Sequence, residues 1–196
     1  MEANPYNKNL IEKNKNLEET IKKVLIIGTE STGKTTLCEN MAKEFKTQFV
    51  HELGRDVTEE VGDTMKLTNE NYCEIFVRHF MEIRKKEKIA NRILFVDTDS
   101  IDTLFWHEVT FDETPQYIYD LEKIVRVSFD AIIYLHPTGK WVDDGTRQFE
   151  KEREVHNQKL LKMVRDAYRR VPLYELKGDF KQNTNDAVEI IKEYLV

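Results

Sequence analysis

The nine residues at positions 28–36, GTESTGKTT, are of the types, and at the spacing, found in phosphate-binding loops. They fit the pattern G-x-x-x-x-G-K-[ST] and directly follow the apolar run VLII. In this pattern backbone N–H groups surround phosphate oxygens, a lysine reaches the β- and γ-phosphates, and a hydroxyl group binds Mg²⁺. The sequence therefore predicts a site for ATP or GTP. Lys34 is its catalytic cation and Thr35 its metal ligand, and its other members are Gly28, Glu30, Ser31, Thr32, Gly33 and Thr36.

A second candidate group follows another apolar run, in the stretch FVDTD at positions 95–99. A metal ion bound with a nucleotide needs a carboxylate at the end of a neighbouring buried strand, and we predict Asp97 for this role. Asp99 has two interpretations. It either caps the helix that we expect to follow, because aspartate is a favoured N-cap residue, or it binds the substrate. The two roles can coincide.

The stretch ELGRD at positions 52–56 follows the second expected strand, and the open ends of such strands bind ligands. Phosphoryl transfer needs a group that orients the attacking hydroxyl. We predict Asp56 as this base, with Glu52 as the alternative, and both as substrate-binding residues. Arg55 either clamps a phosphate group or is simply solvated.

Short apolar runs alternate with helical patterns along the chain. The expected strands are 24–28, 47–53, 92–97, 130–136 and 171–176, and the expected helices are 34–45, 71–90, 100–109, 152–170 and 186–195. Nearly continuous apolar strands between helices are typical of a parallel sheet covered on both faces. We therefore predict an α/β fold of the P-loop NTPase/kinase type, with about five parallel strands between helices. Residues 1–20 are expected to be a tail, and 21–196 one domain.

Composition excludes several classes of protein. The chain has 196 residues and a formal net charge of −6, with no basic stripe for nucleic acid. It has no apolar run of the roughly 18 residues that a membrane span needs. Cys38 and Cys73 match no zinc or redox spacing, so we expect two ordinary buried residues in a reducing compartment. These features predict a cytoplasmic protein.

The segment 137–153 is rich in glycine and charge and lies between an expected strand and an expected helix, which is the composition of a lid. We predict that Arg147 reaches the transferring phosphoryl group, with Lys140 or Arg153 as substitutes. Such a cation stabilises the charge that develops in the transition state.

The motifs together resemble the nicotinamide riboside kinase domain of the NadR family. The resemblance rests on GTESTGKTT, ELGRD, FVDTD and WVDDGTR in this order, and extends over residues 24–150. It implies a P-loop kinase that uses ATP and Mg²⁺ to phosphorylate the 5′-hydroxyl of nicotinamide riboside, which gives NMN for NAD salvage. NadR proteins usually carry an adenylyltransferase domain with an H-x-G-H site before the kinase. About twenty residues precede the first expected strand and no H-x-G-H occurs here, so we expect no adenylyl transfer.

The resemblance also gives the lid tryptophan two interpretations. Trp141 either anchors the lid or stacks on the pyridinium ring of nicotinamide riboside, whose positive charge an aromatic face attracts. Asp143 and Asp144 would favour the same cation, and we count Asp144 among the substrate-binding residues. Two alternatives stay open: a kinase for another nucleoside or nucleotide, and a nucleotide-dependent regulatory NTPase. The oligomeric state is not predicted.

Overall fold

A computed structural model describes residues 21–63, 66–138 and 152–195 of the chain. The described elements, in chain order, are β1 (Lys22–Ile27), α2 (Lys34–Glu44), β2 (Gln48–Val50), α3 (Leu53–Val61), α4 (Asn69–Glu87), β3 (Ile93–Asp97), α5 (Ser100–Thr110), α6 (Gln116–Val125), β4 (Ala131–Leu135), α7 (Arg153–Ala167), β5 (Leu173–Leu176) and α8 (Phe180–Leu195). No helix within the described ranges has the length and apolarity needed to cross a bilayer.

The strands form one parallel sheet in the order β2-β3-β1-β4-β5. The central strand β1 therefore has β3 on one side and β4 on the other, which brings the chain segments after these three strands to the same edge of the sheet. The α/β fold of the P-loop type that the sequence predicts is confirmed.

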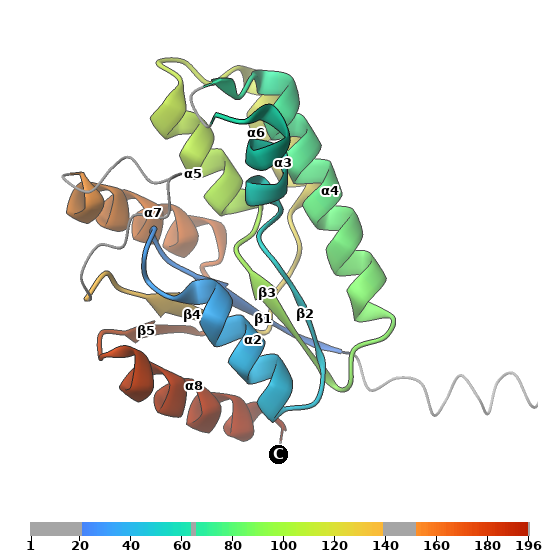
Figure 1. Cartoon of the computed structure of the whole chain (residues 1–196), viewed down its shortest axis with the longest axis vertical. Helices are drawn as coiled ribbons and strands as arrows, with labels where there is room; N and C mark the ends of the chain where they lie inside the picture. The colour runs from blue at the N-terminus through green and yellow to red at the C-terminus, as the bar shows by residue number, and fades with distance from the viewer. Residues whose placement is uncertain (1–20, 64–65, 139–151, 196) are drawn as a thin grey trace, which may run out of the picture.

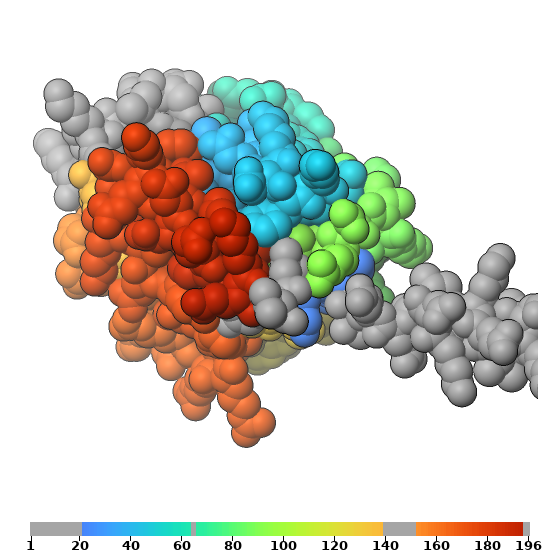
Figure 2. All heavy atoms as spheres, turned by 90° about the horizontal axis from the view of Figure 1, so that it is seen from below, coloured from blue at the N-terminus to red at the C-terminus, as the bar shows by residue number. Residues whose placement is uncertain are grey.

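Alternate residues of β1 supply both faces of the sheet, because successive side chains in a strand point to opposite sides. Val24 and Ile26 pack into a core with α2 and α8, whereas Leu25 and Ile27 pack into a second core with α5 and α7. This double burial is the reason for the unbroken apolar run. Figure 1 shows the sheet between these helices, and Figure 2 shows α2 and α8 side by side on one outer face.

Two helices, α3 and α6, were not among the expected elements. The second expected strand, 47–53, stops at Val50, and the chain enters α3 at Leu53. β2 has three residues and is an edge strand that pairs only with β3. In Figure 1, α3, α5 and α6 gather with one end of α4 beyond the carboxyl ends of the strands.

Candidate functional site

The predicted phosphate-binding loop connects β1 to α2, as its motif requires. A Cβ atom on Gly28 would overlap the carbonyl oxygen of Leu135, so the loop can pass β4 only with glycine at this position. Ser31 and Gly33 have φ angles of 58° and 84°, in the left-handed region. Such a conformation turns successive N–H groups toward one point, and Gly33 has no side chain with which to cap α2. The start of α2 can therefore receive an anion.

A cavity of about 300 Å³ lies at this loop. Its wall combines loop residues with two residues from the beginning of α3, and its lining consists of Ser31, Thr32, Gly33, Lys34, Thr35, Thr36, Glu52 and Arg55. Six of the eight loop residues that the motif singles out thus line it. Gly28 and Glu30 belong to the loop but not to this lining.

Lys34 lies inside the loop in a position to move onto a ligand. Its Nζ donates a hydrogen bond of 3.1 Å to the carbonyl oxygen of Thr29, and the Thr32 hydroxyl donates to the same oxygen at 2.8 Å. A backbone carbonyl is a weak partner for an ammonium group compared with a phosphate. A polyphosphate in the cavity could therefore take over this lysine.

The predicted metal residues Thr35 and Asp97 are in direct contact. The Thr35 hydroxyl donates to Asp97 Oδ2 at 2.6 Å, whereas the buried Oδ1 of Asp97 has no hydrogen-bond partner among the described residues. A hydroxyl and a carboxylate are oxygen donors of the kind that Mg²⁺ prefers. The described part of the chain contains no group of three or more His, Cys, Asp or Glu placed to hold a metal by itself. Mg²⁺ that takes its other ligands from phosphate and water fits this donor set.

The electrostatic environment of Asp97 suits a cation-binding residue. Burial, followed by the charge of Glu52, raises the pKa of Asp97 to about 6, although Lys34 acts in the opposite direction. A bound dication would favour the ionised carboxylate and offset this burial.

Asp99 caps α5, which is one of its two predicted roles. Its Oδ1 accepts hydrogen bonds from the N–H groups of Ile101 and Asp102, and its Oδ2 accepts one from the Tyr168 hydroxyl. The side chain is buried, and burial is the main reason why its pKa is raised to about 6. Thr98, between the two aspartates, has a φ of 63°, a conformation rare for a residue with a branched side chain. Asp99 therefore holds α5 in place, with both oxygens engaged.

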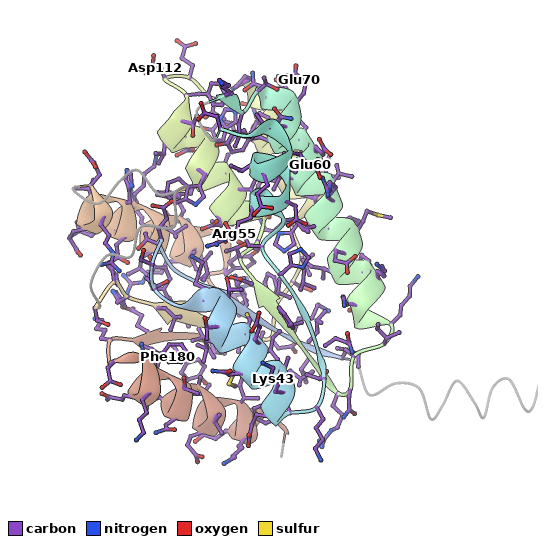
Figure 3. The ribbon with its side chains drawn as sticks, in the orientation of Figure 1. Lys43, Arg55, Glu60, Glu70, Asp112 and Phe180 are labelled. Atoms are coloured by element: carbon purple, nitrogen blue, oxygen red, sulfur yellow. The ribbon has the colours of Figure 1, made fainter. Side chains whose placement is uncertain are left out.

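The two candidate bases have different surroundings. Glu52 lines the cavity and accepts a hydrogen bond of 3.2 Å from Arg55. Asp56 is outside the lining and pairs with His51, whose Nε2 lies 3.0 Å from Asp56 Oδ2. Figure 3 places Arg55 between the near end of α3 and the beginning of α2. The geometry thus favours Glu52, the second choice from the sequence, because α3 begins immediately after it and turns Asp56 away.

Several predicted residues lie outside the described ranges: Lys140, Trp141, Asp143, Asp144 and Arg147. Arg153 is the last residue of the expected lid segment 137–153 and the first residue of α7. It donates a hydrogen bond of 3.1 Å to the carbonyl oxygen of Ser31, so α7 begins beside the phosphate-binding loop.

The sequence motifs did not identify two polar residues at this end of the sheet. Asp102 is 5% exposed in the first turn of α5, and Tyr168 at the end of α7 binds Asp99. The only local signal for Asp102 is its spacing from Asp99, three residues earlier at the start of a helix. Nothing local indicates Tyr168, because its partner is 69 positions away.

The parallel sheet and the loop between β1 and α2 define the class of this protein, a P-loop protein with a kinase-type fold. A family model described as an AAA domain matches residues 23–183, and the chain belongs to this family.

Two curated relatives are similar to most of the chain, and both are the trifunctional NAD biosynthesis/regulator protein NadR. The one from Salmonella typhimurium is 29% identical over 180 residues, and the one from Escherichia coli is 28% identical over 179 residues. Each alignment covers 89% of this chain and 43% of the relative, so the chain spans less than half the length of these relatives. The resemblance to NadR that the motifs indicate is confirmed.

Solved structures show the same fold. A crystal structure of NadR in complex with NR has a TM-score of 0.76 at 24% identity, and the match covers 89% of this chain and 52% of that one. Deoxyadenosine kinase from M. mycoides, with dCMP and dCDP bound, has a TM-score of 0.67 at 16% identity, over 87% of this chain and 99% of that one. These similarities establish the kinase-type fold.

Proposed function

We propose that this chain transfers the γ-phosphoryl group of ATP to the 5′-hydroxyl of nicotinamide riboside. The observation that carries the proposal is the cavity that the phosphate-binding loop shares with Glu52 and Arg55. One wall suits a triphosphate, and the other offers a carboxylate and a guanidinium group to a second molecule. The similarity to NadR, one structure of which is in complex with NR, supports this acceptor.

ATP binding uses the loop and the start of α2. The N–H groups from Ser31 to Thr35 hold the phosphate oxygens, and Lys34 exchanges the Thr29 carbonyl for the β- and γ-phosphates. Thr35 and Asp97 would hold Mg²⁺, which neutralises charge on the phosphates when it is bound. Phosphoryl transfer then depends mainly on positioning and charge stabilisation, for which this arrangement is suited.

The acceptor hydroxyl is oriented by Glu52 in this proposal. Glu52 is the carboxylate that lines the cavity, and its bond to Arg55 fixes its direction. Asp56 is the alternative base. The predicted lid residues Arg147, Trp141 and Asp144 complete the site: Arg147 contacts the transferred phosphoryl group, and the other two contact the cationic ring.

The first experiment is a screen of acceptors with purified protein, Mg²⁺ and ATP. We expect phosphorylation of nicotinamide riboside in preference to adenosine, cytidine, guanosine and uridine. If only another nucleoside is phosphorylated, the proposed acceptor is wrong but the assignment as a kinase stands. Hydrolysis of ATP at one rate with and without every acceptor would refute the proposal and indicate a regulatory NTPase.

Two matched variants test the base. Glu52→Gln and Asp56→Asn each remove a charge without changing the shape of the side chain. We expect Glu52→Gln to lower kcat by about two to four orders of magnitude, the range of general acid–base groups, with a small effect on ATP binding. Asp56→Asn is the control. A large loss in Asp56→Asn with little in Glu52→Gln would reverse the assignment.

A further inference from the structure

One side of α4 is exposed along the whole length of the helix. Its other sides pack against α3, α5, α6 and β2, and Figure 1 shows the helix along the outside of the molecule. If Lys85 is left aside, the exposed residues follow one another at steps of four, three, four, three and four, which places them in one stripe. This α4 stripe consists of Glu70, Glu74, Val77, Met81, Arg84 and the C-cap residue Lys88.

The α4 stripe is ordered by the type of its side chains. Two carboxylates lie at its N-terminal end, two apolar side chains in its middle and two cations at its C-terminal end. The apolar pair is Val77, which is 45% exposed, and Met81, which is 59% exposed. The solvated face of a surface helix is usually polar, and methionine is enriched where proteins contact one another. The middle of the stripe is therefore a candidate contact surface.

The order of the charges makes the α4 stripe complementary to a second copy of itself. When two α4 helices lie antiparallel about a two-fold axis at position 79, Val77 of each copy faces Met81 of the other. In this register Glu74 faces Arg84, and the carboxylate and the ammonium group at the two ends of the stripe face each other in the same way. The axis repeats every contact, so both copies contribute the same residues. A parallel pair would instead place like charges opposite one another, which is unfavourable.

Two charged residues of the stripe also make ion pairs within their own chain. Glu74 accepts a hydrogen bond of 3.2 Å from Arg78, and Arg84 donates one of 2.9 Å to Glu87. Both pairs lie at the surface, where the Glu74 side chain is 45% exposed and the Arg84 side chain 59% exposed. Exposed ion pairs contribute little to stability, so these side chains can turn toward a second copy at a small cost in free energy.

We propose that the chain forms a reversible dimer in which two α4 helices pack antiparallel along this stripe. A second copy is the occupant that the charge order selects, since an acidic or a basic partner would match only one end of the stripe. The inference is independent of the proposed function, because the stripe residues are not part of the cavity lining. With 19 residues at 1.5 Å each, the helix is about 28 Å long. One helix pair of this length buries less area than a standard interface, so we expect a dissociation constant of about 1 to 100 µM.

The first test measures self-association of the purified chain by sedimentation velocity, at about 5 to 300 µM and at low ionic strength, where exposed charges are least screened. Val77→Glu places a charge in the middle of the stripe. Its matched control is Val155→Glu, the same change at a valine of α7 that is 68% exposed. We expect Val77→Glu to raise the dissociation constant by about tenfold or more, and Val155→Glu to leave it within about twofold of the wild type.

The second test reverses the facing charges. Glu74→Lys and Arg84→Glu each create two pairs of like charges across the axis, and each should raise the dissociation constant by about 5-fold to 30-fold. The double variant Glu74→Lys/Arg84→Glu exchanges the two charges and should return to within about threefold of the wild type. An equimolar mixture of the two single variants should form a dimer that neither variant forms alone at the same concentration.

Each other outcome overturns the inference. A wild type that stays monomeric at about 300 µM leaves the stripe to a different partner. A dimer that Val77→Glu does not weaken, or that Val155→Glu weakens equally, forms through another surface. Losses in both charge variants without recovery in the double variant or in the mixture exclude the antiparallel register. Circular dichroism of every variant separates loss of the dimer from loss of the fold, and Met81→Glu decides the first test if Val77→Glu does not fold.

Discussion

His79 should make the stability of this protein depend on pH between about 6.5 and 4. The imidazole is 3% exposed on α4, a helix that packs against α3 and β2, and its Nε2 has no hydrogen-bond partner among the described residues. Burial lowers its pKa from 6.5 to about 4, and the nearby charges of Glu52 and His51 act in opposite directions. His79 therefore stays neutral in the folded protein at pH values where the unfolded chain binds a proton.

The sign and the size of the effect follow from this difference. Above pH 6.5 both states are neutral at His79, and stability does not depend on it. As the pH falls below 6.5, His79 binds a proton in the unfolded state but stays neutral in the folded state. The free energy of unfolding therefore decreases until the pH reaches about 4. Each pH unit in this range costs about 1.4 kcal/mol, which gives a loss of about 2 kcal/mol by pH 5.

The assay is urea unfolding of the wild type and His79→Leu at pH 7.5, 6.5, 5.5 and 5.0, followed by circular dichroism. Other titrating groups are common to both proteins, so the difference between the two free energies of unfolding isolates His79. We expect His79→Leu to gain about 2 kcal/mol relative to the wild type between pH 6.5 and 5.0. Two curves that stay parallel within about 0.5 kcal/mol would refute the reasoning.

Three further predictions concern the site. Lys34→Ala should abolish phosphoryl transfer without changing the thermal midpoint, and normal turnover would contradict the phosphate-binding assignment. Gly28→Ala should lower both the thermal midpoint and nucleotide affinity, because the new Cβ overlaps the Leu135 carbonyl oxygen; Gly54→Ala, where the nearest atom is 3.8 Å away, is its control and should change neither. Trp141→Leu should reduce kcat/KM for nicotinamide riboside by several-fold to about thirtyfold relative to a neutral nucleoside, and equal losses for both acceptors would make Trp141 a lid anchor.

The sequence by itself determined the sheet and the phosphate-binding loop. Both depend on local spacing: Gly28, Gly33, Lys34 and Thr35 act within one turn between a strand and a helix, so their order along the chain nearly fixes their geometry. The position of Asp97 beside the loop was predictable for a similar reason, because a carboxylate at the end of a buried parallel strand meets the loop at the same edge of the sheet.

Tertiary structure decided where the two carboxylates of ELGRD lie. The sequence ELGRD does not distinguish Glu52 from Asp56. In the structure β2 ends at Val50 and α3 begins at Leu53. Glu52 therefore lines the cavity, whereas Asp56 pairs with His51. β2 is an edge strand that pairs only with β3, and the preference of a residue for a strand depends strongly on its tertiary context.

Asp102 shows most clearly what could not be predicted from the sequence. In the sequence it is an acidic residue in the first turn of a helix, where solvated carboxylates are common because they favour the helix dipole. Only the packing of α5 against α7 and the end of the sheet buries it and brings it within reach of the charges of Lys34 and Glu52. These residues are 68 and 50 positions away in the chain, and contacts at such separations depend on how the elements pack rather than on any local pattern.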